Sequence, residues 1–150
     1  MGFLGHLTGH NDPKSIGAAL AHKDSDRLVI DLQADGDALF TPSALWTAAH
    51  YRLPLLIVME NNRAYNNSVT HADRVAAARE RPRHNNIVGT TIDEPPVDFS
   101  LLARAFGIHA EGPIDDPTSL RTALERALTV VVDERRPALV DVHTRGGSGV

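Results

Sequence analysis

The stretch "RLVIDLQADGDALFTPSALWTAAHYRLPLLIVMENN" (residues 27–62) contains two apolar runs with a helix-like segment between them. The runs at 27–32 and 53–60 are short and almost continuously apolar, which is typical of strands buried on both faces of a sheet. Between them, Thr41 and Pro42 predict the cap and the first turn of a helix. A strand, a helix and a second strand in this order predict parallel pairing through a right-handed crossover.

The rest of the chain continues the alternation of helices and strands. We expect helices at 15–24, 97–107 and 117–135, strands at 108–112 and 137–144, and loops at 1–14 and 61–96, the second with one short helix near 71–80. This alternation predicts an α/β fold with three layers, α/β/α, around a mainly parallel sheet. We expect residues 1–144 to form one domain and residues 145–150 a flexible tail.

Helix ends give further local signals. Asp98 and Gly107 predict the start and the end of the helix at 97–107, and Asp116 with Pro117 predicts the start of the longest helix. An apolar stripe along that longest helix predicts packing on a sheet. Its members are Leu120, Leu124, Ala127, Leu128 and Val131.

Charge and composition exclude several classes of function. The formal net charge is −4, so we expect no general attraction to nucleic acid or to an anionic membrane. The chain has no cysteine, which excludes disulfides and thiolate sites. No apolar run approaches the roughly 20 residues that a membrane-spanning helix needs. We therefore expect a cytoplasmic protein.

Polar side chains follow both predicted strands of the opening stretch. Asp35 comes after the first strand and Asn62 after the second. Because parallel strands place their carboxyl ends at one edge of a sheet, both side chains are expected at the same edge. Carboxylate and amide oxygens suit Mg²⁺, which completes its shell with water and phosphate oxygens. Gly36 would let a phosphate approach the backbone.

A simpler interpretation of the same residues stays open. Asp-Gly after a strand is a common surface turn, and Asn-Asn can form a turn without any ligand. A nucleotide-binding fold of the Rossmann or flavodoxin type is a further alternative, although no G-x-G-x-x-G follows a predicted strand. Spacing alone does not separate these possibilities.

Residues 34–65, "ADGDALFTPSALWTAAHYRLPLLIVMENNRAY", resemble the cofactor-binding motif of thiamine diphosphate-dependent enzymes. That motif begins with Gly-Asp-Gly at a strand end and finishes with Asn-Asn about thirty residues later. The interior is similar to the branch of acetolactate synthase and benzoylformate decarboxylase. "GHNDPKSIGAALA" (9–21), "VDFSLLARAFG" (97–107) and "RPALVDVHT" (136–144) extend the resemblance over most of the chain, as the family's diphosphate-binding domain.

The resemblance implies two cofactors, thiamine diphosphate and Mg²⁺. By position, Asp35 and Asn62 would be metal ligands through their side chains, and Ala64 through its backbone carbonyl. Gly36, Asp37 and Ala38 would contact the diphosphate, with Asn62, Ala64 and Tyr65 close by.

The resemblance also implies a reaction and a partner. It points to a decarboxylase or carboligase of small 2-oxoacids, working as an oligomer. The glutamate that activates the cofactor belongs to a pyrimidine-binding domain, which nothing in this chain resembles. This chain would therefore need that domain from another chain or from a longer protein.

Several residues depart from the family pattern. Ala34 stands at the first glycine of the motif, Asn11 at another usual glycine, and Leu7 or Thr8 near the residue that supports the bent cofactor. These departures keep a second hypothesis open, in which the chain is a non-catalytic remnant or an interaction subunit that retains the fold.

The catalytic residues stay unknown from the sequence. His10 is a weak candidate, because it stands where the family places residues near the thiazolium ring. The eight histidines show no zinc-binding spacing. Trp46 and Tyr51 are expected to pack rather than to bind, and the basic segment 74–84 to form a solvated helix face or a subunit contact.

Overall fold

The computed structural model describes residues 3–4 and 11–145. In chain order its elements are β1 (Phe3–Leu4), α1 (Asn11–Ala21), β2 (Leu28–Ala34), α2 (Asp35–Ala38), α3 (Ala44–His50), β3 (Leu55–Asn61), α4 (Asn66–Ala78), α5 (Phe99–Ala105), β4 (His109–Ile114), α6 (Pro117–Asp133) and β5 (Ala138–His143).

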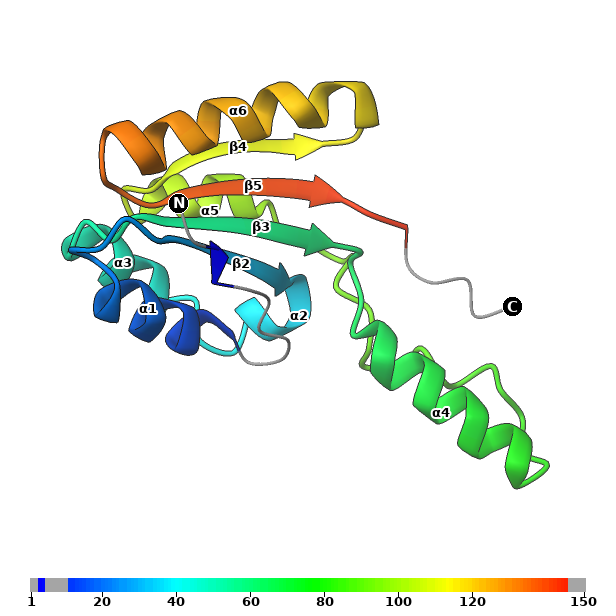
Figure 1. Cartoon of the computed structure of the whole chain (residues 1–150). Helices are drawn as coiled ribbons and strands as arrows, with labels where there is room; N and C mark the ends of the chain where they lie inside the picture. The colour runs from blue at the N-terminus through cyan, green and yellow to red at the C-terminus, as the bar shows by residue number, and fades with distance from the viewer. Residues whose placement is uncertain (1–2, 5–10, 146–150) are drawn as a thin grey trace.

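One parallel sheet organises the fold, with the strand order β1-β2-β3-β5-β4 (Figure 1). The β2–β3 register ends with Ala34 opposite Glu60, and the β3–β5 register ends with Asn61 opposite His143. The carboxyl ends of these strands therefore lie at one edge. The predicted α/β/α fold with its parallel sheet is confirmed.

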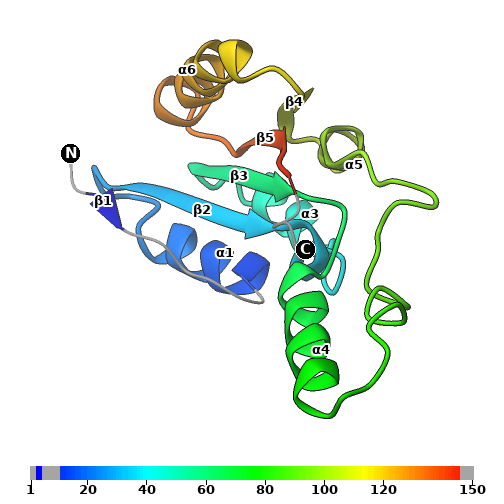
Figure 2. The ribbon, with the colours of Figure 1, turned by 90° about the vertical axis from the view of Figure 1, so that its right-hand side faces the viewer.

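Helices cover the two faces of the sheet unequally (Figure 2). Ile16, Leu45 and Phe99, from α1, α3 and α5, belong to one core cluster. On the other face α6 alone contributes a second cluster, through residues such as Ala127 and Val131. The right-handed crossovers β1-α1-β2 and β2-α3-β3 place their helices on the first face.

The predicted caps of α5 and α6 are confirmed. The Asp98 carboxylate accepts the N–H of Leu101 at 2.7 Å, and the Asp116 carboxylate accepts the N–H of Thr118 at 2.9 Å. Gly107 follows α5 with φ of 83°, a conformation that favours glycine. Along α6, Ala127 and Val131 are buried, while the three leucines of the predicted stripe are only half-buried at its margin.

The prediction for the start of α3 was wrong. The helix begins at Ala44, and Ser43 precedes it without a side-chain cap. The carbonyl of Thr41 accepts the N–H of Ala44 at 2.9 Å, so residues 41–44 form a turn before the helix. The chain needs this turn to leave α2 before it can enter α3.

Residues 1–14 were predicted as a loop, and this was wrong at both described parts. Phe3–Leu4 pair with Leu28 and Val29 of β2, and α1 already begins at Asn11. A strand of two residues has no periodic pattern that the sequence could reveal, because its only support is the neighbouring strand.

The polar segment 61–96 contains a longer helix than predicted. α4 runs from Asn66 to Ala78, buries none of its side chains, and extends away from the sheet (Figure 1). Asp73 of α4 pairs with Arg83 of the returning chain and accepts a hydrogen bond from Asn86. The basic segment thus lies largely in solvent.

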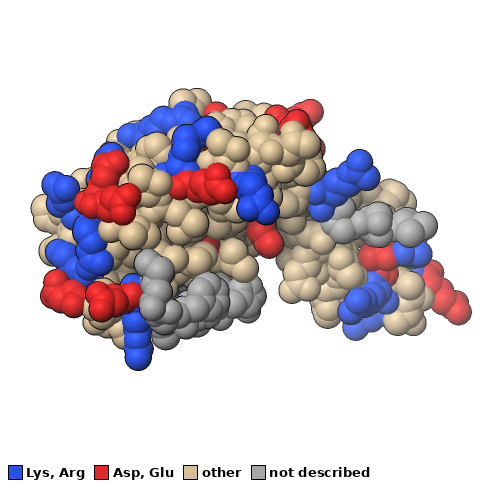
Figure 3. Space-filling model, turned by 45° about the horizontal axis from the view of Figure 1, so that its top comes forward, with Lys and Arg blue, Asp and Glu red and all other residues tan. Residues whose placement is uncertain are grey.

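Acidic and basic side chains are intermixed on the face drawn in Figure 3. Arg126 pairs with Glu111 at 2.7 Å and Arg136 with Glu134 at 2.6 Å. In the part of the chain that the structure describes, no helix combines the length and the apolar composition needed to cross a bilayer.

Candidate functional site

The carboxyl end of β2 leads into a buried acidic side chain. Asp35, the first residue of α2, is 1% exposed, and its carboxylate accepts the N–H of Gly36 at 2.7 Å and that of Ala64 at 3.3 Å. Burial raises the pKa of Asp35, and backbone hydrogen bonds from residues 36 and 62–64 oppose that rise. Among the described residues no Lys, Arg or His forms an ion pair with it. Such a carboxylate is a candidate cation ligand.

The carboxyl end of β3 brings Asn62 to the same place. Its Oδ1 accepts the N–H of Ala64 at 2.9 Å, and this is the N–H that also reaches Asp35. One amide therefore draws together side-chain oxygens that lie 27 positions apart in the sequence. Asp35, Asn62 and Ala64, the three predicted metal ligands, are neighbours in the structure.

The space beside Gly36 is occupied by an aromatic ring. A Cβ at this position would lie 2.5 Å from Cε1 of Tyr65. The same ring faces Phe40, with centroids 6.1 Å apart. The missing side chain makes room for Tyr65 in this structure, whereas the sequence predicted room for a phosphate.

A hollow of about 530 Å³ opens at this edge of the sheet. Its lining includes most of the predicted site residues, namely Asp35, Gly36, Asp37, Asn62, Ala64 and Tyr65. Ala38 lies outside the lining, because its side chain is 2% exposed and belongs to the core. Only the backbone of Ala38 is left for contact with a cofactor.

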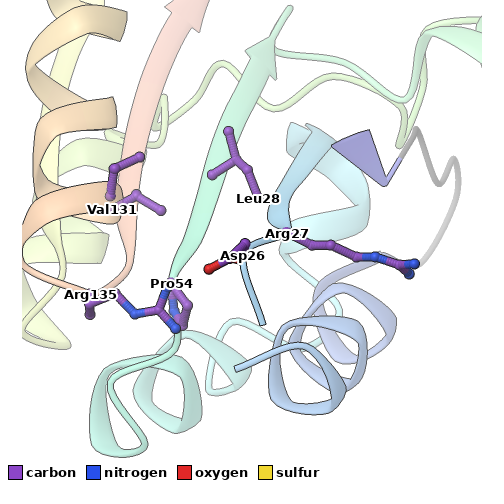
Figure 4. Close-up of a pocket in the computed structure, with 7 residues that line it drawn as sticks. Asp26, Arg27, Leu28, Pro54, Val131 and Arg135 are labelled. Atoms are coloured by element: carbon purple, nitrogen blue, oxygen red, sulfur yellow. The ribbon is translucent and has the colours of Figure 1, made fainter. Parts of the chain in front are cut away.

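A second hollow, of about 380 Å³, lies at the opposite edge of the sheet, where β2 and β3 begin (Figure 4). Leu28, Pro54 and Val131 supply apolar walls, and Arg27 extends away from Val131 and Arg135. The guanidinium of Arg135 donates to the carbonyl of Lys23. Ligands of parallel sheets bind at the carboxyl ends of the strands, so the first hollow is the candidate site.

A short antiparallel contact holds residues 63–65 in place. The N–H of Tyr65 donates to the carbonyl of Thr90 at 2.8 Å, and the N–H of Ile92 donates to the carbonyl of Arg63 at 2.7 Å. The sequence did not predict this contact, because its polar composition predicts only a loop with one helix over 61–96. The segments before and after α4, residues 63–65 and 90–92, therefore meet at the candidate site.

The inner face of β2 is polar toward its carboxyl end. Asp31 and Gln33 of β2 and Asp35, which directly follows the strand, stand at every second position, and each is at most 1% exposed. Within the described residues, Gln33 Oε1 has no hydrogen-bond partner. This polar face was not among the sequence-based predictions, although the two-residue spacing in "DLQAD" is a signal for it.

A buried carboxylate also lies behind the site, in β5. Asp141 accepts the side-chain N–H of Asn61 at 3.1 Å and the N–H of Phe99 at 3.1 Å, and it is fully buried. Burial raises the pKa of Asp141, while the hydrogen bond from Asn61, the nearby His143 and the N–H of Phe99 lower it in part. Asp141 thereby fixes the residue that precedes Asn62. The sequence offered no signal for this pairing across 80 positions.

Some predicted residues lie outside the described part of the chain. These are His10, Leu7 and Thr8, together with the tail beyond residue 145. The weak assignment of His10 to catalysis therefore stays a prediction.

The donor set at the candidate site fits a hard divalent cation. One buried carboxylate, one amide oxygen and a backbone carbonyl are the ligand types that Mg²⁺ accepts beside water and phosphate. In residues 11–145 no three His, Cys, Asp or Glu side chains gather to hold a metal. A cation here would therefore depend on Asn62 and on the backbone as well as on Asp35.

Comparison with known proteins agrees with this geometry. The family model of the thiamine pyrophosphate enzyme, C-terminal TPP binding domain, matches residues 3–142. Benzoylformate decarboxylase of Pseudomonas aeruginosa is 31% identical over 137 residues, covering 91% of this chain and 23% of its own length. Acetolactate synthase large subunit of Pyropia yezoensis is 32% identical over 133 residues, covering 89% of this chain and 20% of its own length.

A solved structure shows the same fold. The thiamine diphosphate-dependent 4-hydroxybenzoylformate decarboxylase of Rhodococcus jostii RHA1 superposes with a TM-score of 0.69 at 29% identity, covering 89% of this chain and 22% of its own. The chain spans a quarter or less of the length of these relatives. By its family model and its fold, the chain belongs to the thiamine pyrophosphate enzymes, as their C-terminal cofactor-binding domain.

Proposed function

We propose that this domain anchors thiamine diphosphate through a Mg²⁺ ion held by Asp35, Asn62 and the carbonyl oxygen of Ala64. The observation that carries the proposal is the N–H of Ala64, which reaches both the Asp35 carboxylate and Asn62 Oδ1. A divalent cation at these oxygens would offset the cost of burying the charge of Asp35.

The proposed reaction class is decarboxylation or carboligation of a small 2-oxoacid, as the names of the relatives suggest. When bound, thiamine diphosphate supplies the nucleophilic carbon and the electron-accepting ring for such chemistry. The task of this chain is to hold the metal at Asp35 and to orient Asn62 through the N–H of Ala64. Preorganised groups of this kind need no rearrangement during the reaction.

A pyrimidine-binding domain would complete the catalytic site, supplied by another chain or by another part of the same protein, in an oligomer. Two observations support this part of the proposal. The relatives are at least four times as long as the matched domain, and the hollow at the candidate site is open to solvent rather than enclosed. The expected location in the cytoplasm stays a prediction.

Calorimetry tests the metal assignment. Mg²⁺ and thiamine diphosphate are titrated into the chain, with a pyrimidine-domain chain present, for wild type, Asp35→Asn and Asp37→Asn. We expect Asp35→Asn to weaken Mg²⁺-dependent binding by about tenfold or more, as loss of a metal ligand does. The control Asp37→Asn alters a neighbouring carboxylate that is not a proposed ligand. Equal binding by wild type and Asp35→Asn contradicts the assignment.

A second candidate is a non-catalytic subunit that retains the fold. Ala34 at the first position of the motif and the ring of Tyr65 against Gly36 favour it. A decarboxylation assay with Mg²⁺, the cofactor and a panel of 2-oxoacids, with and without the partner chain, separates the two. Turnover in any combination rejects the non-catalytic candidate.

A further inference from the structure

Arg63 has an unusual backbone conformation for its place in the fold. Four described non-glycine residues have positive φ: Arg52, Arg63, Glu80 and Arg135. Arg52, Glu80 and Arg135 each follow the last turn of a helix, where a left-handed residue commonly ends the helix. Arg63, with φ of 58°, follows a strand and lies between Asn62 and Ala64. A side chain disfavours this conformation, so something must hold it.

The side chain of Arg63 is held at the carboxyl ends of β4 and β5. Its Nη2 lies 3.3 Å from Nδ1 and 3.4 Å from Nε2 of His143. His143 in turn lies 2.6 Å, from Nδ1 to Oδ1, from Asp115. We call Arg63, His143 and Asp115 the clamp.

The chemistry of the clamp defines its donors and acceptors. The Asp115 carboxylate only accepts, so Nδ1 of His143 carries the proton that it donates. The Arg63 guanidinium can only donate, and its Nη2 lies at almost the same distance from both ring nitrogens of His143, at 3.3 and 3.4 Å. The side chain of His143 is 18% exposed and that of Asp115 is 76% exposed, so the ring is sheltered while its partner lies in solvent.

We propose that Arg63 is a positioning residue, which the clamp holds in the left-handed conformation so that Asn62 and Ala64 face Asp35. The clamp acts from the side of β5, opposite to Asp35. The backbone of Arg63 is fixed as well, because its carbonyl accepts the N–H of Ile92. Rotation of Arg63 to negative φ would turn Ala64 away from the two side-chain oxygens. The inference rests on the proposed function only where it concerns cofactor binding.

The test uses the whole chain and two measurements. Hydrogen exchange of the Ala64 and Tyr65 amides reports the loop without any ligand, and calorimetry with Mg²⁺ and thiamine diphosphate, with a pyrimidine-domain chain present, reports binding. The variants are His143→Ala, Arg63→Ala, Arg63→Gly and the double variant Arg63→Gly with His143→Ala. His109→Ala is the matched control, because His109 forms a comparable pair with Glu111 (3.2 Å) on β4.

We expect His143→Ala and Arg63→Ala to speed exchange of both amides by about tenfold, the factor that matches the cost of the left-handed conformation. Arg63→Gly should have a smaller effect, because glycine adopts this conformation without help. In the Arg63→Gly background, His143→Ala should then leave the exchange rates of both amides unchanged. His109→Ala should leave both amides as in wild type.

Additive effects of Arg63→Gly and His143→Ala overturn the inference, and so does wild-type exchange in His143→Ala. The ligand measurement separates this failure from that of the proposed function. If the amides respond as expected and no variant, wild type included, binds the cofactor, the clamp stands and the proposed function falls. If binding requires Asp35 and amide exchange is unchanged in the clamp variants, the proposed function stands and the inference about the clamp falls.

Discussion

At the scale of the residue, the burial of Asp35 opposes the charge of its carboxylate in the ligand-free protein. This carboxylate is buried and accepts backbone hydrogen bonds from Gly36 and Ala64, but it forms no ion pair among the described residues. A raised pKa means that the folded chain binds the proton of Asp35 more tightly than the unfolded chain does. Its contribution to stability is therefore present at low pH and is lost as the pH rises through the folded pKa.

We expect Asp35→Asn to stabilise the ligand-free chain at neutral pH by about 1 kcal/mol, because the amide removes a buried charge. The gain should shrink as the pH falls below the pKa of Asp35 in the folded chain, where wild type is also neutral. Urea unfolding of both proteins between pH 7 and pH 4 measures this difference in the free energy of unfolding. A gain that grows toward low pH contradicts the sign derived from burial.

Gly36 and Tyr65 form a contact that a double-mutant cycle can isolate. Gly36→Ala should cost about 1 kcal/mol, because the new Cβ meets Cε1 of Tyr65 at 2.5 Å and the ring must move. In a Tyr65→Ala background the cost should largely disappear. Denaturant unfolding of the four proteins measures the coupling, and equal costs in both backgrounds show that the ring is not the obstacle.

At the scale of the element, the helix caps show how local sequence sets helix ends. The Asp98 carboxylate accepts hydrogen bonds from the N–H of Leu101 and from Ser100 Oγ, which lies 2.6 Å away. Burial raises the pKa of Asp98, but these hydrogen bonds and the charge of Arg104 outweigh it, so the pKa is lowered overall. The pKa shift of Asp98 is therefore opposite in direction to that of Asp35.

Asp98→Ala should destabilise the chain at neutral pH by about 1 kcal/mol, as loss of an N-cap does. The difference should shrink as the pH falls through the lowered pKa of Asp98, because the protonated carboxyl of wild type no longer makes charge-assisted hydrogen bonds. Asp98→Asn is the matched control, since asparagine also caps helices. Thermal unfolding across pH measures both variants, and a loss that is the same at every pH contradicts the role of the charge.

The helix α4 depends on little besides itself. It has 13 residues, and none of its side chains is buried. Helices of this length are marginal without tertiary packing. We expect peptides from 66–78 to exchange amide hydrogens at least about tenfold faster than peptides from α6, whose inner face is packed on the sheet. Equal protection of the two helices in the isolated chain would show that α4 has support that its exposed side chains do not reveal.

At the scale of the whole molecule, apolar side chains stay in solvent. Leu20, Phe40, Trp46, Tyr51 and Leu101 are each at least half exposed. Trp46 stacks on His50, with ring centroids 4.7 Å apart, so it packs as predicted but on the surface rather than in the core. Exposed apolar side chains are typical of surfaces that associate with another chain or domain, and association of this chain stays a prediction.

Ligand binding should stabilise the whole fold. At about 100 times the dissociation constant, Mg²⁺ with thiamine diphosphate should raise the free energy of unfolding by about 2.7 kcal/mol. Removal of the metal with EDTA should abolish the shift, and Asp35→Asn should not show it. Thermal unfolding with each component alone and together measures this, and a shift from the cofactor without metal contradicts a metal-mediated anchor.

Much of this architecture follows from local patterns. The apolar runs around residues 28–34 and 55–61, the caps at Asp98 and Asp116, and the stop at Gly107 are set by side chains within a few positions of one another. Such signals survive in the sequence because they need no distant partner. The fold class, the ends of α5 and the start of α6 could therefore be predicted, and so could the common sheet edge of Asp35 and Asn62.

Contacts between distant residues were decided only by the tertiary structure. β1 exists because β2 lies beside it, Asp141 is buried against Asn61 across 80 positions, and the ring of Tyr65 fills the space that Gly36 leaves. The left-handed Arg63 likewise depends on His143 from the far end of the chain. The sequence by itself determined which residues carry the oxygens that we propose as ligands. Their orientation came from tertiary contacts, because a side chain adopts a disfavoured or buried state only when remote neighbours compensate its cost.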